Sequence, residues 1–323
     1  MRKIRILFIF SNKKNKIINP FIKSQGDSLK KNGIDVEYFP IVGTGLRGYY
    51  RSIPILKKKL ALDRFHIIHA HYGLCGIIAL LSKRKEKLVV SFMGDDLIGS
   101  VNTYGTYTVA SKFLARINKF FAYHIFDFNI VKSRNLFNQI SKASMIEIIP
   151  NGVDFTIFYP VEKAVARKEL KIKEESIIIL FASNPMRLEK NFQLAQAAFE
   201  YLNLVDSELI TVCDLTQSEL NLYYNASDML LLTSYHEGSP NVIKEAMACN
   251  CPIVSTDVGD VKELFDGNVG YEICSYEHTD VAKKIKKIFD YTERTKGREK
   301  VLHLEINVIA NRLISIYNKL LRI

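Results

Sequence analysis

Residues 234–248 read SYHEGSPNVIKEAMA, and this stretch decides how the chain around it must fold. It lies between two short apolar runs, 229–233 and 252–255, so the pattern predicts a strand, a loop, a helix and a second strand in succession. Ser239 is a favoured residue at a helix N-cap, and Pro240 suits the first helical position. We therefore expect the helix to begin at this point and to end before residue 249.

Two carboxylates flank this predicted helix start. Glu237 lies in the loop together with Gly238, and Glu245 lies in the second turn of the helix. The N–H groups of the first turn, with Asn241 and Val242, should point outward at the positive end of the helix dipole and form a site for a diphosphate. The carboxylates can then accept hydrogen bonds from sugar and ribose hydroxyls, or, alternatively, only complement the helix dipole.

The same alternation of short apolar runs and helical patterns extends over the whole chain and predicts an α/β fold with parallel sheets covered on both faces. In the first half we expect strands at 4–10, 35–40, 67–70, 87–92 and 129–131, and helices at 20–32, 49–63, 76–83 and 109–126. In the second half we expect strands at 177–182, 208–213, 229–233, 252–255 and 270–273, and helices at 192–202, 217–225, 240–248 and 279–293.

The turn-rich sequence IIPNGVD at 148–154 predicts a boundary between two domains. We expect a first Rossmann-like domain at 1–153 and a second at 154–302. Residues 303–323 carry apolar side chains at three- and four-residue spacing, which predicts a final helix that packs back on the first domain.

Composition narrows the class of protein. The 323 residues are 48% hydrophobic, which suits two folded domains, and 45 Lys and Arg against 34 Asp and Glu give a net charge of +11. The five cysteines form no CxxC pair, so we expect neither a disulfide framework nor a zinc site. No apolar stretch approaches the roughly 20 residues that span a bilayer, and the first apolar run is too short for a signal sequence. We expect a cytoplasmic protein.

Glu237 and Glu245 form an E-x7-E element that resembles that of the retaining glycosyltransferases of the GT-B fold, family GT4. The resemblance continues through AMACNCPIVSTDVG at 246–259 and is detailed over about 228–264. It implies two Rossmann-like domains that face a central cleft, with the acceptor held mainly by the first and a nucleotide sugar, such as a UDP-sugar, by the second.

A second segment, FASNPMRLEKNFQLA at 181–195, follows a predicted strand and opens a helix. In the family this position supplies an arginine and a lysine to the donor diphosphate, and Arg187 and Lys190 have a similar spacing. The resemblance thus implies catalytic roles for Glu237, Arg187 and Lys190, donor contacts near Asn184, and no requirement for a metal or cofactor, because fixed cations can neutralise the leaving group. The alternative is a solvated pair on a loop.

In the first half, HAHYG at 69–73 and SFMGDD at 91–96 each follow a predicted strand, where open α/β sheets place ligands. We expect His71, Gly94 and Asp95 to contact the acceptor or the sugar. The family often has a histidine where Met93 stands. Two histidines could also bind a metal, but no third ligand has suitable spacing.

The resemblance implies transfer with retention to a glycan or polyprenol-linked acceptor, in the assembly of a bacterial surface polysaccharide such as capsule or lipopolysaccharide. Basic amphipathic segments at 51–64 and 111–126 predict peripheral contact with anionic lipid at the inner face of the plasma membrane. Two alternatives remain: a non-hydrolysing sugar-nucleotide epimerase of the same architecture, and a non-catalytic donor- or nucleic-acid-binding protein. The sequence shows no RNA-binding signature and no concentrated basic stripe, so we expect no nucleic acid partner.

Overall fold

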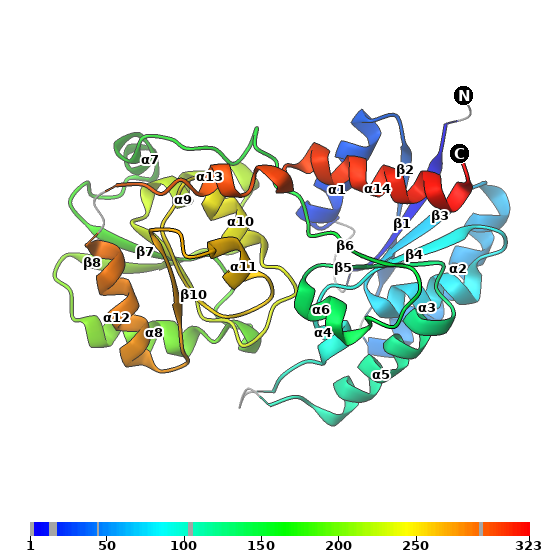
Figure 1. Cartoon of the computed structure of the whole chain (residues 1–323), viewed down its shortest axis with the longest axis horizontal. Helices are drawn as coiled ribbons and strands as arrows, with labels where there is room; N and C mark the ends of the chain where they lie inside the picture. Colours follow the sequence, from blue (N-terminus) through cyan, green and yellow to red (C-terminus); the bar gives the residue numbers. More distant parts are fainter. Residues whose placement is uncertain (1–2, 13–17, 44, 103–105, 291–292) are drawn as a thin grey trace. The chain divides into compact units, whose positions relative to one another are not determined.

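The computed structural model describes residues 3–12, 18–43, 45–102, 106–290 and 293–323. The chain forms two compact units (Figure 1). Unit 1 comprises residues 1–100, 107–152 and 306–323, and unit 2 comprises residues 101–106 and 153–305. The expected ranges of 1–153, 154–302 and 303–323 differ from these by one to three residues at the two main boundaries.

Unit 1 is a six-stranded parallel sheet in the order β2-β1-β3-β4-β5-β6. Its elements are β1 (Arg5–Asn12), α1 (Pro20–Lys31), β2 (Asp35–Val42), α2 (Gly45–Leu62), β3 (Ile67–His71), α3 (Gly73–Ser82), β4 (Lys87–Ser91), α4 (Asp95–Ile98), α5 (Val109–His124), β5 (Phe128–Val131), α6 (Arg134–Gln139), β6 (Ile146–Ile148) and α14 (Ile306–Leu321). Helices α2, α3 and α5 cover one face of the sheet, and α1 and α14 pack together on the other.

Alternation along β1 explains the two layers of unit 1. Leu7 and Ile9 point into the core under α2 and α3, whereas Phe8 contacts His69 and His71 on the opposite face. Both faces are buried, as parallel sheets require, so β1 is an almost continuous apolar run.

Unit 2 is a five-stranded parallel sheet in the order β11-β10-β9-β7-β8. Its elements are α7 (Lys163–Leu170), β7 (Ile177–Phe181), the 3-10 turn η1 (Leu188–Lys190), α8 (Phe192–Leu202), β8 (Ser207–Thr211), α9 (Gln217–Ala226), β9 (Met229–Leu232), α10 (Asn241–Ala248), β10 (Ile253–Thr256), α11 (Val261–Phe265), β11 (Tyr271–Cys274), α12 (His278–Phe289), α13 (Gly297–Lys300) and the 3-10 turn η2 (Leu302–Leu304). Helices α8 and α12 pack on one face, and α7, α9 and α10 lie on the other.

The fold class predicted from the sequence is confirmed: two parallel sheets, each covered by helices. The details differ where the sequence signal is short. Strand β6 was not predicted because it has only three residues, all partly exposed at the sheet edge. The last helix begins at Ile306 and not at residue 303, because η2 precedes it and Glu305 forms a parallel bridge with Val153. Helix α12 ends at Phe289, and residues 291–292 of its expected range lie outside the described residues.

Candidate active site

The strongest candidate site lies in unit 2, where the neighbouring strands β7 and β9 end. The loops that follow these strands are tied together. The Thr233 hydroxyl donates to the Asn191 carbonyl at 2.9 Å and to the Lys190 carbonyl at 3.1 Å, and the Tyr235 N–H donates to the Glu189 carbonyl at 2.9 Å. These bonds hold the segment around Lys190 against the segment that begins the E-x7-E element.

As a result, Lys190 and Glu237 form an ion pair, with 2.5 Å between Nζ and Oε1. The buried Ser234 hydroxyl donates to the same oxygen at 2.9 Å. Both charged side chains retain little exposure, 12% for Lys190 and 16% for Glu237. No described side chain bonds Oε2 of Glu237, so this carboxylate is oriented by a cation and a hydroxyl and still has an oxygen to offer to a ligand.

Arg187 and Asn184 occupy the outer part of the same loop. The Arg187 side chain is 59% exposed and forms an ion pair with Glu189, two residues further on. Asn184 Oδ1 accepts from the Met186 N–H at 2.8 Å and shapes the turn that leads to Arg187. Of the two predicted cations, the structure therefore brings Lys190 to Glu237 and leaves Arg187 at the surface.

The expected N-cap at Ser239 is wrong. Helix α10 begins at Asn241, Pro240 is its N-cap residue, and no side chain caps it. The Ser239 hydroxyl is engaged elsewhere, because it donates to Asp260 Oδ2 at 2.7 Å and accepts from Lys244 Nζ at 3.1 Å. Asn241 and Val242 do form the first turn, as expected.

Gly238 lies against the turn that follows β10. A Cβ atom at Gly259 would stand 3.0 Å from the Gly238 carbonyl oxygen, and Gly259 has φ of +63°. A side chain at position 259 would thus be strained by its backbone conformation and by this contact. The close approach fixes the path of the loop between Glu237 and α10.

Glu245 lies in the second turn of α10 and is half-buried. The hydroxyl of the fully buried Tyr224 donates to Glu245 Oε2 at 3.0 Å. Burial raises the pKa of the Glu245 carboxyl to about 7, although this hydrogen bond opposes the shift. Glu245 therefore changes its charge near neutral pH.

In unit 1, the predicted histidines lie beneath the surface. His69 is fully buried and bonds Tyr317 and Ser91, each at 2.7 Å. His71 is 3% exposed, stacks on His69 with 4.5 Å between ring centroids, and has no described hydrogen-bond partner at either nitrogen. Burial and the neighbouring positive charges keep the pKa of His71 well below its ordinary value, so its ring is neutral.

Sequence reasoning selected Asp95, but its neighbour Asp96 organises this part of unit 1. Asp96 is buried and accepts from the N–H groups of Gly73, Met93 and Gly94, each at 3.0 Å. Asp95 is half-buried, and Tyr72 and Ser100 approach its carboxylate at 3.5 and 3.4 Å. The signal that could have found Asp96 is its place in the first turn of a short helix after a strand, where a carboxylate can reach back to the N–H groups of the residues before the helix.

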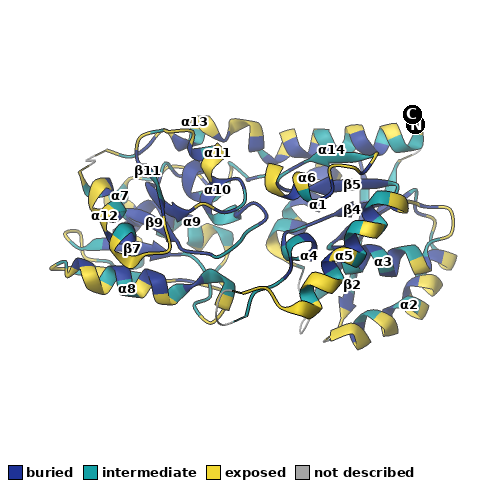
Figure 2. Cartoon of the chain, turned by 60° about the horizontal axis from the view of Figure 1, so that its bottom comes forward, coloured by how far each residue is buried: buried dark blue, intermediate teal, exposed yellow. Residues whose placement is uncertain are grey.

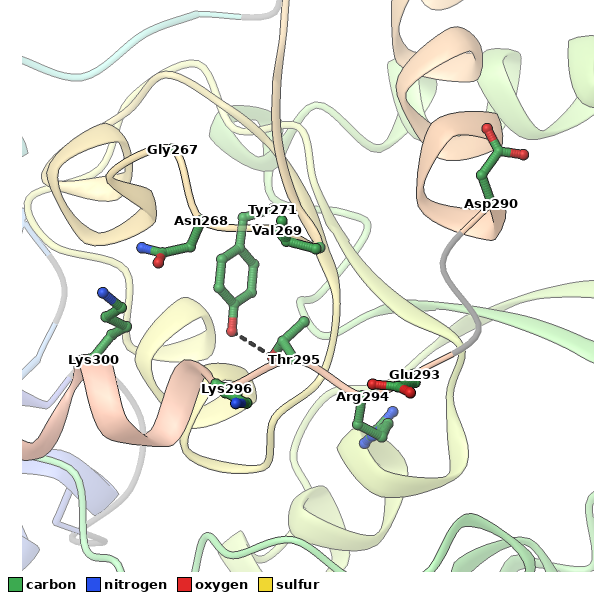
Figure 3. A pocket seen from close by; sticks show the side chains of 11 residues that line it. Gly267, Asn268, Val269, Tyr271, Asp290, Glu293, Arg294, Thr295, Lys296 and Lys300 are labelled. Atoms are coloured by element: carbon green, nitrogen blue, oxygen red, sulfur yellow. Dashed lines mark hydrogen bonds between the residues drawn. The ribbon is translucent and has the colours of Figure 1, made fainter.

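A separate pocket of about 520 Å³ lies in unit 2 at the edge where the strands begin, because it opens beside Gly270 and Tyr271 at the start of β11 (Figure 3). Its lining also includes Lys300 and Thr295, and the hydroxyl of Thr295 forms a hydrogen bond with that of Tyr271 at 2.6 Å. The site around Glu237 lies where the strands end. The pocket and the Glu237 site therefore lie at opposite ends of the strands of one sheet.

Over the described part of the chain, no helix is both long and apolar enough to cross a membrane. Within the same residues, no three His, Cys, Asp or Glu side chains come together as a metal site would need.

Two family sequence models match the chain. Residues 20–156 match "Glycosyltransferase Family 4", and residues 168–290 match "Glycosyl transferases group 1". The second match contains Lys190 and the whole E-x7-E element.

The chain is similar to curated proteins of known sequence. It is 25% identical over 193 residues to a D-inositol 3-phosphate glycosyltransferase of Arthrobacter sp. (strain FB24), covering 50% of this chain and 46% of that protein. It is 24% identical over 259 residues to TuaC of Bacillus subtilis (strain 168), a glycosyltransferase assigned to teichuronic acid biosynthesis, covering 68% of this chain and 64% of that protein. The chain thus spans about half to two thirds of the length of these relatives.

Solved structures share the fold. Sucrose-phosphate synthase from Thermosynechococcus elongatus aligns with a TM-score of 0.85 at 18% identity, over 99% of this chain and 100% of the other. Anabaena Alr3699/HepE, in complex with UDP-glucose, aligns with a TM-score of 0.70 at 14% identity, over 97% and 99%. With both sheets, the ion-paired E-x7-E element and the two family matches in place, the chain belongs to the GT4 glycosyltransferases (glycosyl transferases group 1), which have the GT-B fold.

Proposed function

We propose that this chain transfers a sugar from a nucleoside-diphosphate sugar to an acceptor, with retention of the anomeric configuration and without a metal ion. The observation that carries the proposal is the Lys190–Glu237 ion pair, which joins the loop before α8 to the loop before α10. Charge grows on the diphosphate as the glycosidic bond breaks, and a fixed ammonium group and backbone N–H groups at a helix start stabilise such charge. Arg187 adds a second cation once it leaves Glu189.

The donor contacts follow from the same geometry. Glu237 accepts hydroxyl groups of the sugar, Glu245 accepts those of the ribose, and residues 238–242 with Asn184 surround the diphosphate. The complex of Alr3699/HepE with UDP-glucose supports a UDP-sugar as the donor. The departing phosphate removes the acceptor proton in this mechanism, and no side chain of the chain is assigned as general base.

The acceptor is a glycan or a polyprenol-linked glycan, and the product belongs to a bacterial surface polysaccharide such as capsule or lipopolysaccharide. The likeness to TuaC supports a surface polymer. At the acceptor, Asp95 and Gly94 offer a carboxylate and a tight backbone turn, and His71 lies in the layer beneath. Tyr72, between these groups, has φ of 97°, and such backbone strain in a non-glycine residue is typical of functional sites.

One surface of unit 1 supports contact with membrane at the cytoplasmic face. Helix α5 is exposed along one side (Figure 2). Val109, Phe113 and Phe120 are 85%, 60% and 54% exposed, and the exposed cations Lys112 and Arg116 each lie within one helical turn of them. An apolar stripe with interleaved cations suits anionic lipid. Co-sedimentation with vesicles should require anionic lipid and should weaken in Phe113→Ser/Phe120→Ser; equal binding to neutral vesicles would remove this part of the proposal.

The proposed activity is tested by binding and by product analysis. Isothermal titration against UDP, GDP, ADP and CMP, and against their common sugars, in EDTA, should give binding to one nucleoside diphosphate and its sugar. Incubation of that sugar nucleotide without acceptor should leave it unchanged. Conversion to an epimer would instead establish an epimerase, and the absence of nucleotide binding would favour a binding protein of another kind.

A further inference from the structure

A buried charged cluster lies under the start of α10 and does not include the two glutamates of the E-x7-E element. Its members are Ser239, Lys244 and Asp260, which are 9%, 0% and 6% exposed. Lys244 Nζ donates to the Ser239 hydroxyl at 3.1 Å, and that hydroxyl donates to Asp260 Oδ2 at 2.7 Å. The hydroxyl therefore links a buried cation to a buried anion.

The cluster joins two strand ends. Ser239 belongs to the loop that follows β9, and Asp260 belongs to the turn that follows β10. Two further contacts run in parallel: Thr256 Oγ1 donates to the Ser234 carbonyl at 2.8 Å, and Gly259 closely approaches Gly238. The loop that carries Glu237 is thus fastened to the rest of unit 2 on the side away from Lys190.

Stability alone is a poor reason for a lysine at position 244. The residue lies on the buried stripe of α10, next to Ile243 and one turn before Met247. Burial of an ammonium group costs several kcal/mol on the general scale, and a well-packed apolar residue in place of a buried ion pair is often as stable. The charged cluster also fixes the geometry of the loop. Hydrogen bonds are directional and hold the loop in one conformation more strictly than apolar contacts do.

We propose that Lys244 is a positioning residue, which acts through Ser239 and Asp260 to hold residues 238–240 and the first turn of α10 in the geometry that receives the donor diphosphate. The inference rests on the proposed function and deepens it. Lys244 does not touch the ligand; it acts on donor affinity through the loop.

The test is a double substitution that removes both charges. Lys244→Met leaves Asp260 buried without a nearby cation and should lower the melting temperature for that reason alone. Lys244→Met/Asp260→Asn removes both charges at similar volume and should keep the melting temperature near that of the wild type. We expect this double variant to bind the donor nucleotide at least tenfold more weakly than the wild type. Ser239→Ala, which keeps both charged side chains and removes only the hydroxyl that links them, should lower the affinity for the donor nucleotide about fivefold. Lys262→Met, on the exposed side of α11, is the matched control and should bind normally.

The outcomes distinguish a failure of the positioning role of Lys244 from a failure of the proposed function. If the double variant or Ser239→Ala melts normally and binds the nucleotide within twofold of the wild type, Lys244 and its partners have a structural role only, and the inference is overturned while the proposed function stands. If the wild type itself binds no nucleoside diphosphate, the proposed function fails and the inference fails with it. Weak binding by folded variants, with normal binding by Lys262→Met, supports the inference.

Discussion

The sheets of the two units end in sites that use their carboxylates in opposite ways. In unit 2, Glu237 is oriented by side chains, since Lys190 and Ser234 both bond Oε1. In unit 1, Asp96 is enclosed by backbone, and both of its oxygens accept N–H groups of Gly73, Met93 or Gly94. A carboxylate held by a cation on one oxygen can still bind a ligand, whereas one surrounded by backbone N–H groups fixes the shape of a loop.

This difference distinguishes a carboxylate that binds ligand, Glu237, from one that stabilises the fold, Asp96. Substitution of a ligand-binding carboxylate should lower turnover and leave stability nearly unchanged, and substitution of a loop-fixing carboxylate should do the reverse.

The largest expected effect is on turnover in Glu237→Ala. Loss of one charge-assisted contact in the transition state costs about 3–4 kcal/mol, so kcat/KM should fall by about 10²–10³-fold with little change in melting temperature. Steady-state kinetics with the donor identified by titration is the measurement. Glu277→Ala, an exposed glutamate of the same unit, is the control. Kinetics within threefold of the wild type would remove Glu237 from the site.

The two cations should differ in their effects. Lys190 is mostly buried and bonded to Glu237, and Arg187 is exposed and must first leave Glu189. We therefore expect Lys190→Ala to lower kcat/KM by about 10²-fold and Arg187→Ala by about tenfold, since an exposed pair is worth little before it is redirected. A larger loss in Arg187→Ala than in Lys190→Ala would show that the outer arginine carries the diphosphate and that the ion pair seen here is secondary.

Much of the fold and of the candidate site could be predicted from the sequence, because the sequence patterns were long or chemically specific. Alternating apolar runs predicted both parallel sheets, and the E-x7-E spacing singled out Glu237 together with Glu245. Whether these residues bind the donor remains a prediction.

What could not be predicted depends on contacts between distant segments. Ser239 has the composition of an N-cap, but its hydroxyl bonds Asp260, which lies 21 residues away. Lys244 stands at helical spacing from Pro240 and Met247, a signal for burial that went unused because lysine is so often exposed. Likewise, Asp95 and Asp96 are neighbours of the same residue type, and the sequence does not tell which of the two side chains is buried.

In Asp96→Asn, stability should change more than turnover. Burial raises the pKa of Asp96 to about 7 from 3.8, so the stability that this carboxyl contributes is complete below its unfolded pKa and is lost as the pH rises through about 7. The advantage of the wild type over Asp96→Asn should therefore shrink by about 2.7 kcal/mol between about pH 5 and pH 7, and stay nearly constant above that pH. Hydrogen exchange of amides in β3 and β4 would measure it within unit 1. The same pH slope in both proteins would contradict the assignment.

The smallest expected effect is a pH dependence of donor affinity, which we assign to Glu245. With a pKa of about 7, the Glu245 carboxyl is partly protonated in the free protein at neutral pH, and the ionised form, whose two oxygens only accept, is the better partner for ribose hydroxyls. Donor affinity should therefore rise with pH and level off above about pH 7, and each unit below should cost at most about tenfold, or about 1.4 kcal/mol. A sugar nucleotide is the proper probe, since its diphosphate is esterified at both ends and does not titrate here. Glu245→Gln should bind more weakly and without this pH dependence. A Glu245→Gln variant that keeps the slope would mean that another group titrates, and Glu245 would then resemble Asp96: a carboxylate that supports the fold, through Tyr224, and does not meet the ligand.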